Sequence, residues 1–462
     1  MNTLKYNKIR IFHGNPRNCF PFIALLLAIN LCLFTSLHGQ SGYQKELDSL
    51  LATFPKKGPG GVVMVIENNK ILCTGAYGFA DIEWNIPNGP DVKFRIGSLT
   101  KSFTALGILQ LAEKGKLTLD DKVTKWLPDS PVDENVKIRN LLSHTSGVQQ
   151  DKKELVFSPG ERMNYSNYGY LLLGRIISKV SGVPYGQYIE ENIFRPLQML
   201  NSGYDNSREV LPKRASGYSY DGNSITNAPY IDMEGPGAAG GLYSTLNDLY
   251  LFEKSLYGTK LFSPGLLEMA FTPFKLNDGT SSRYGLGWMV NDFNGWREVS
   301  HGGDIEGFNC YFAHYPDKKR TVIVLQNIKL NMGSDWSEAG KLAHNITGLF
   351  WKRELKTPAA VVAEVLVPVE KLQLLTGNYE FENLPAEMIA AMGSKLNITT
   401  EGGKLYVQDK NGKAAVKAVS DTEFVVQGID IKIKFIAVND EKASGLIFKF
   451  MGIREFTAKR VQ

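Results

Sequence analysis

The order of strand-like and helix-like segments is the strongest constraint on the fold of this 462-residue chain. Two apolar runs, 61–66 and 70–73, flank Asn68-Asn69 and predict a β-hairpin. Residues 102–252 are mainly helical in pattern, and residues 308–327 return to strands. Strands, then helices, then strands favour an α+β domain in which helices flank an antiparallel sheet.

The C-terminal part of the chain has a different pattern. From Leu372 onward, short alternating segments are separated by glycine turns such as Gly402-Gly403. They predict a separate all-β domain over residues 372–462, which is an ordinary domain size. Residues 352–371 contain two prolines and are predicted to be a linker, and a helix near 334–350 is expected to close the preceding domain.

The N-terminus has the pattern of a secretory signal peptide. Residues 1–39 carry four basic and no acidic side chains, and their apolar run, Phe20 to Phe34, is short for a membrane span. We expect cleavage near Gly39 and a periplasmic or secreted protein that has no membrane contact beyond this signal. An uncleaved anchor is the alternative. Without this segment the formal net charge falls from +5 to +1, so no nucleic-acid partner is predicted.

The chain contains one Ser-x-x-Lys sequence, Ser98-Leu99-Thr100-Lys101, at the start of an apolar helix predicted over 98–115. Residues three apart lie on one helix face, and the helix N-terminus offers N–H groups to developing negative charge. A serine hydroxyl needs a base beside it, and a lysine whose charge is disfavoured by burial can be that base. The alternative is a helix-start serine with a solvated lysine, which a buried helix disfavours.

Two further motifs extend this possible site. Tyr165-Ser166-Asn167 follows Pro159-Gly160 and opens a second apolar helix, which runs from Tyr168 to Gly182. Tyr204-Asp205-Asn206 repeats the tripeptide without such a helix, so Tyr165 is preferred. His301-Gly302-Gly303 ends a short strand-like run, where paired glycines permit close approach of a ligand. Taken singly, Tyr165 could be a core tyrosine and His301 a turn histidine.

These residues resemble the class C β-lactamase-related serine hydrolases, which include esterases, peptidases and D-amino-acid amidases. The resemblance covers roughly residues 45–350. The matching motifs occur in the order found in the family: Ser98-Leu99-Thr100-Lys101, Leu142-Ser143-His144-Thr145-Ser146-Gly147, Pro159-Gly160, Tyr165-Ser166-Asn167, Gly240-Gly241-Leu242-Tyr243-Ser244-Thr245, Tyr284-Gly285-Leu286-Gly287-Trp288 and His301-Gly302-Gly303.

The resemblance implies a β-lactamase-like antiparallel sheet flanked by helices, with an all-helical region, over residues 40–351. It also implies a role for each motif residue. Ser98 would be the nucleophile, and Lys101 and Tyr165 would move the proton. The substrate-binding and oxyanion positions would be Asn167, His301, Gly303 and Asp304, with the backbone N–H groups of Asp304 and Ser98 forming the oxyanion hole.

One departure from the family bears on the substrate. Classical β-lactamases carry Lys-Thr-Gly where this chain has His301-Gly302-Gly303, so the lysine that would pair with a β-lactam carboxylate is missing. We therefore expect an exported hydrolase of small peptides, amides or esters. The alternatives are a β-lactamase or D,D-carboxypeptidase proper, and a non-catalytic penicillin-binding or peptidoglycan-sensing protein. A Ser-His-Asp α/β-hydrolase is set aside because the chain has no Gly-x-Ser-x-Gly.

The remaining expectations concern cysteines, metals and the C-terminal domain. Beyond the signal, only Cys73 and Cys310 remain, and the family's fold would place them on strands that are not neighbours. Free, buried thiols are therefore predicted. No zinc-ligand spacing occurs, so no metal or other cofactor is expected, and the oligomeric state stays open. The C-terminal domain resembles a lipocalin-like barrel through Gly377-Asn378-Tyr379, and a structural cap is the preferred role.

Overall fold

The computed structural model describes residues 42–461 apart from several short segments. The omitted positions are 207, 221–223, 259–260, 331–337, 357–364, 383, 385–388, 390–391, 411, 427–430, 437–441 and 451–453. The predicted signal peptide lies outside the described residues. Within them, no helix is both long and apolar enough to cross a membrane.

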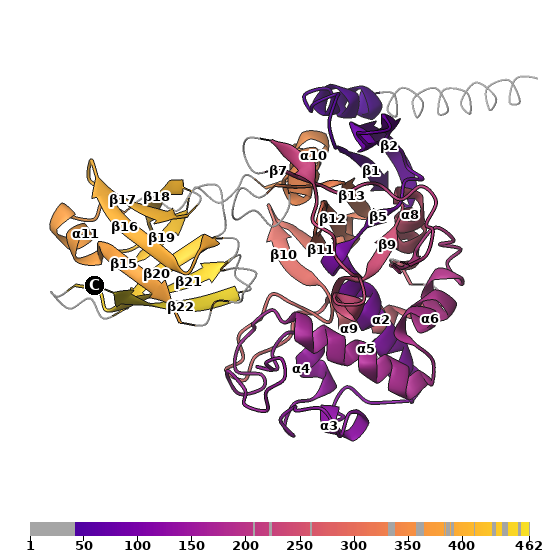
Figure 1. The fold of residues 1–462 in the computed structure, drawn as a ribbon, viewed down its shortest axis with the longest axis horizontal. Helices are drawn as coiled ribbons and strands as arrows, with labels where there is room; N and C mark the ends of the chain where they lie inside the picture. Colours follow the sequence, from indigo (N-terminus) through magenta and orange to yellow (C-terminus); the bar gives the residue numbers. More distant parts are fainter. Residues whose placement is uncertain are drawn as a thin grey trace, which may run out of the picture.

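A six-stranded antiparallel sheet lies at the centre of the first domain (Figure 1). Asn68 and Asn69 both have positive φ, 52° and 61°, as the tight turn of the predicted hairpin requires. The hairpin is therefore confirmed. In spatial order the strands are β10 (Met289–Phe293), β11 (Trp296–Ile305), β12 (Phe308–Tyr315), β13 (Arg320–Gln326), β1 (Gly61–Glu67) and β2 (Lys70–Tyr77).

Both faces of this sheet are buried. Along β1, Val62 and Met64 point into the core shared with the helical region, whereas Val63 and Val65 point into a second core. This alternation is the period of two of a β-strand. The second core is covered by α10 (Glu338–Trp351) and by the helix of residues 42–51. The predicted helix near 334–350 is thus found, although residues 331–337 lie outside the described part.

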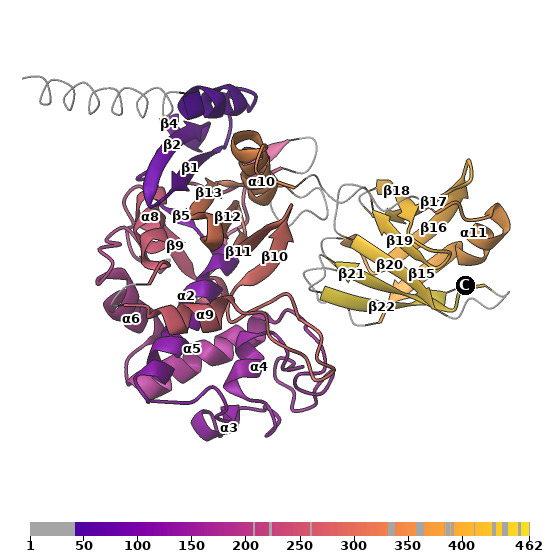
Figure 2. The ribbon, with the colours of Figure 1, turned by 180° about the vertical axis from the view of Figure 1, so that it is seen from behind.

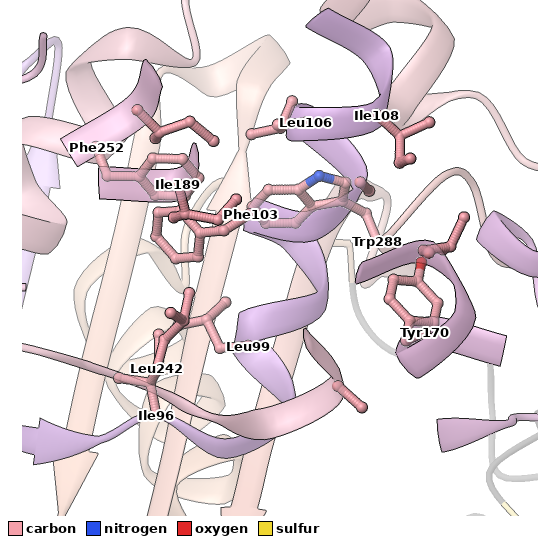
Figure 3. Packing of buried hydrophobic residues seen from close by; sticks show 14 of the residues in the cluster. Ile96, Leu99, Phe103, Leu106, Ile108, Tyr170, Ile189, Leu242, Phe252 and Trp288 are labelled. Atoms are coloured by element: carbon pink, nitrogen blue, oxygen red, sulfur yellow. The ribbon is translucent and has the colours of Figure 1, made fainter. Parts of the chain in front are cut away.

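The helix that carries the Ser-x-x-Lys sequence runs through the first core. A 3-10 turn, η2 (Gly97–Leu99), leads into α2 (Thr100–Glu113), of which every residue from Thr100 to Leu111 is buried. Figure 3 shows Phe103 on this helix, packed among the apolar side chains that surround it. The prediction of a buried helix is confirmed, but its first two residues form the 3-10 turn.

The remaining helices of this domain pack into the first core, and most of them are seen together on one side of the sheet in both views (Figures 1 and 2). The predicted helix after Tyr165 is present as α5, because Ser166 caps its N-terminus and Gly182, with φ 80°, ends it. These helices are α3 (Val123–Trp126), α4 (Ile138–Leu142), α5 (Asn167–Ser181), α6 (Tyr185–Ile189), α7 (Gly237–Gly240), α8 (Leu246–Ser255) and α9 (Pro264–Phe271), with the π-helical turn η3 (Glu190–Phe194).

Short strands connect these helices to the sheet. One small sheet joins β5 and β6 through β9, and so links the segment before Ser98 to the segment after α7. The short elements are β3 (Phe79–Asp81), β4 (Ile86–Pro87), β5 (Phe94–Arg95), β6 (Gly203–Tyr204), β7 (Tyr218–Tyr220), β8 (Ile225–Asn227), β9 (Leu242–Ser244), β14 (Ile328–Leu330) and the 3-10 turn η4 (Pro316–Lys318).

The C-terminal domain is a closed barrel of eight strands, in which each strand pairs with the next and the last pairs with the first. Buried and exposed side chains alternate along its strands, and the interior holds a core of its own. The all-β prediction is confirmed. The strands are β15 (Gly377–Phe381), β16 (Lys395–Glu401), β17 (Lys404–Asp409), β18 (Gly412–Ala418), β19 (Glu423–Val426), β20 (Ile431–Ile436), β21 (Gly445–Phe450) and β22 (Arg454–Val461).

One helix before the barrel was not predicted. α11 (Val369–Leu375) crosses the predicted limit between residues 371 and 372, and its Leu372 and Leu375 pack into the barrel core. A helix of seven residues is too short to produce a clear helical period in the sequence.

The two remaining cysteines are free and buried, as predicted. Cys73 lies on β2 and Cys310 on β12, and two other strands, β13 and β1, separate them in the sheet.

Candidate active site

The Ser-x-x-Lys sequence forms a contact at the point where η2 becomes α2. The Lys101 side-chain nitrogen Nζ lies 3.0 Å from Ser98 Oγ and donates a hydrogen bond of 2.7 Å to the Ala239 carbonyl of α7. Lys101 is fully buried, whereas Ser98 is half-buried. A half-exposed hydroxyl therefore lies beside a buried amine, which is the arrangement that serine activation requires.

Two tyrosine rings surround the amine. Lys101 Nζ lies 4.8 Å from the ring centroid of Tyr165 and 5.7 Å from that of Tyr170. The other Tyr-x-Asn tyrosine, Tyr204, lies in β6, where its ring packs against Tyr185 at 6.0 Å and its hydroxyl contacts the Met233 carbonyl at 3.4 Å. Of the two tripeptides, the structure brings Tyr165 to the lysine.

His144 holds Tyr165 in place, a role that the sequence did not reveal. Its ring packs on the Tyr165 ring at 4.2 Å between centroids. Its Nδ1 accepts a hydrogen bond from the backbone N–H of Ser166, and its carbonyl accepts one from Asn164. The backbone on both sides of Tyr165 is therefore tied to one buried histidine. The motif that contains His144 belongs to the resemblance, but nothing in the sequence shows that it folds back onto Tyr165.

The strand that carries His301-Gly302-Gly303 has an open edge at this motif. β10 pairs with β11 only as far as Ser300, so residues 301–305 have a neighbouring strand, β12, on one side. Ile305 and Phe308 flank a two-residue turn and form a hydrogen-bonded pair. Hydrogen-bonded and non-hydrogen-bonded pairs alternate along an antiparallel ladder, so Asp304 and Gly302 belong to non-hydrogen-bonded pairs. Their backbone N–H and C=O groups therefore point away from β12.

Two close approaches show that this part of β11 lies against the segment that leads into η2. A methyl group on Gly97, whose φ is +47°, would lie 3.0 Å from the Asp304 nitrogen. A methyl group on Gly303 would lie 1.9 Å from the Ile96 carbonyl oxygen, which excludes any side chain there. The Gly302 carbonyl accepts a hydrogen bond from the His301 ring rather than from β12. The Asp304 N–H is therefore directed toward the turn that carries Ser98.

His301 is fully buried and engaged at both ring nitrogens. Its Nδ1 lies 2.6 Å from the Gly302 carbonyl and therefore carries the proton, so Nε2 accepts from the Tyr284 hydroxyl at 2.9 Å. Burial, reinforced by the charge of Lys101, lowers the pKa of His301 to about 3. The imidazole is neutral near pH 7 and offers no positive charge to a substrate carboxylate.

The side chains of two predicted site residues, Asn167 and Asp304, contribute less to the site than those of Lys101 and Tyr165. Asn167 is the first residue of α5 and is exposed. The Asp304 carboxylate pairs with Lys329 at 3.2 Å and accepts from Asn309 at 3.3 Å, so only its backbone is directed toward η2. Among the residues that the structure describes, no group of three or more His, Cys, Asp or Glu side chains could hold a metal ion.

Fold and site together are those of a β-lactamase-like serine hydrolase. The family model described as Beta-lactamase matches residues 47–343, and the chain therefore belongs to the β-lactamase family. Penicillin-binding protein 4* of Bacillus subtilis (strain 168) is 29% identical in an alignment of 448 positions, which covers 88% of this chain and 96% of the relative.

Two solved structures share the fold. The octameric penicillin-binding protein homologue from Pyrococcus abyssi is 24% identical, with a TM-score of 0.60 over 91% of this chain and 99% of that one. A D-stereospecific amidohydrolase from Streptomyces sp. is 26% identical, with a TM-score of 0.55 over 66% of this chain and 97% of that one.

Proposed function

We propose that the protein is an exported serine hydrolase that cleaves an amide or ester bond through an acyl-enzyme on Ser98. The observation that carries the proposal is the 3.0 Å contact between the buried Lys101 amine and the half-exposed Ser98 hydroxyl. Export rests on the signal-like pattern of residues 1–39.

The proposed reaction uses four residues. Lys101 in its neutral form accepts the Ser98 proton, with Tyr165 as its partner, while Oγ forms a bond to the substrate carbonyl carbon. The carbonyl oxygen becomes an oxyanion that accepts hydrogen bonds from the N–H groups of Ser98 and Asp304. The proton then passes to the leaving nitrogen or oxygen as its bond to carbon breaks. Water attacks the acyl-enzyme by the reverse proton path and releases Ser98.

The substrate class follows from the charge at position 301. A neutral, buried imidazole replaces the lysine that would attract a β-lactam carboxylate. We expect p-nitrophenyl esters or D-amino-acid amides to be cleaved with a higher kcat/KM than nitrocefin or ampicillin. The 26% identical structure of a D-stereospecific amidohydrolase is consistent with this class. A kcat/KM for either β-lactam above that of every ester and amide would contradict the assignment.

The nucleophile can be tested by mass spectrometry. A fluorophosphonate probe is expected to add one adduct to the wild type, and trypsin isolates Ser98 on the peptide 96–101, apart from Ser102. Ser98→Ala is expected to lose the adduct. An unchanged adduct in Ser98→Ala would overturn the assignment. A penicillin adduct that forms without turnover of any ester or amide would instead indicate the non-catalytic penicillin-binding alternative.

A further inference from the structure

A buried carboxylate lies on the strand of the open edge, on the opposite face from His301. Glu298 is 1% exposed and accepts three hydrogen bonds of 2.8 Å, from Tyr311, Tyr315 and His344. Burial raises the pKa of this carboxyl, but the His344 charge and the phenol hydrogen bonds outweigh that effect, so the pKa is lowered. An ionised carboxylate is tolerated inside a protein only with such partners.

Tyr311 connects this carboxylate to the open edge. It pairs with Gly302 across β11 and β12, and a methyl group on Gly302 would lie 3.3 Å from its ring. The Tyr311 ring thus fills the place of a side chain at Gly302. Its hydroxyl donates to Glu298 and lies 3.0 Å from Ser300 Oγ. The ring that covers the back of Gly302 is therefore fixed by hydrogen bonds to two residues of the same strand.

His344 supplies the positive charge from α10. Its ring stacks on Phe293 of β10 at 4.5 Å, and its side chain is 35% exposed. The titratable groups that contact it are Glu298 of β11 and Tyr311 of β12, and Tyr315 bonds to the same Glu298 oxygen as His344 does. On α10, Lys341 pairs with Glu338. Burial lowers the pKa of His344, but Glu298 raises it by more, so the net shift is upward.

We propose that Glu298 is a positioning residue that, through Tyr311, holds the Gly302–Asp304 edge in place opposite Ser98. The effect on the reaction rate rests on the proposed function, whereas the effect on the edge itself does not. A mispositioned oxyanion donor weakens an interaction made in the transition state, so kcat falls and KM changes little.

The test compares three variants by two measurements. Tyr311→Phe keeps the ring but removes its hydroxyl, and Glu298→Gln removes the charge. Glu253→Gln is the control, because Glu253 is equally buried but lies on α8 and bonds to Thr321 of β13. The measurements are hydrogen exchange of the peptide segment 301–305 and kcat with KM for an ester substrate.

We expect Tyr311→Phe and Glu298→Gln to exchange faster over 301–305 and to lose about 10- to 100-fold in kcat, the size of loss that a small misplacement causes. The control is expected to match the wild type in both. Unchanged exchange and kcat in Tyr311→Phe would overturn the proposal. If Glu298→Gln does not fold, Tyr311→Phe alone decides, because it retains the packed ring.

The pH dependence of kcat distinguishes a positioning role of Glu298 from a purely stabilising one. As pH rises through the raised pKa of His344, Glu298 loses its cationic partner. Wild-type kcat is therefore expected to fall at alkaline pH, and kcat of His344→Gln is not expected to show this fall. Identical profiles would contradict the role of the His344 charge in the proposal. Failure of the proposed function would appear separately, as a wild type with no adduct on Ser98, and would leave the exchange result to decide the positioning role.

Discussion

Lys101→Met is expected to lower kcat/KM by about 10²- to 10⁴-fold, the usual contribution of a general base. Methionine fills nearly the same buried volume but has no nitrogen to accept the Ser98 proton. The measurement is turnover of the best ester or amide, with circular dichroism and a thermal melt to verify folding.

The matched control lies on the same helix. Lys114→Met changes an exposed lysine at the C-terminal end of α2, whose contact is Asn192 at 3.5 Å. It is expected to leave kcat/KM unchanged, because it leaves the 3.0 Å contact between Lys101 and Ser98 intact. A folded Lys101→Met enzyme with near wild-type turnover would exclude Lys101 as the base. Ser98 would then have to be activated by another group.

Tyr165→Phe is expected to lose a comparable factor, about 10²- to 10⁴-fold, whereas Tyr204→Phe is expected to stay close to the wild type. Both changes remove one hydroxyl from a tyrosine in a Tyr-x-Asn tripeptide, so each is the control for the other. Lys101 Nζ is 4.8 Å from the Tyr165 ring, while the Tyr204 hydroxyl contacts the Met233 carbonyl.

The comparison is made at several pH values with one substrate, because the protonation of Lys101 also affects the rate. If Tyr204→Phe loses turnover and Tyr165→Phe keeps it, the wrong tyrosine has been assigned. If both keep it, Lys101 transfers the proton without a phenol. In that case the packing of His144 on Tyr165 would serve the fold of this region rather than the reaction.

The chain shares its fold with the β-lactamase family but departs from the resemblance at position 301. The sheet and the helical region are those of the fold class, whereas His301 stands where the resemblance to classical β-lactamases would imply a lysine. The structure adds the reason why the histidine stays neutral: it is buried, and both its ring nitrogens have partners.

The sequence alone determined the features that depend on neighbours along the chain. The β1–β2 hairpin follows from two asparagines that tolerate positive φ, and α5 from a capping serine and a terminal glycine. The spacing of Ser98 and Lys101 along one helical segment likewise brings the hydroxyl beside the amine through local geometry.

The tertiary structure alone decided which distant groups meet at the site. Ala239 accepts from Lys101 across 138 positions of sequence, and His144 reaches Ser166 across 22. The open edge at Asp304 depends on where β10 stops pairing, and the support behind it depends on Glu298 meeting a helix 46 residues away. Such contacts are set by the packing of whole helices and strands. A local pattern of residue types does not indicate which element will pack against it.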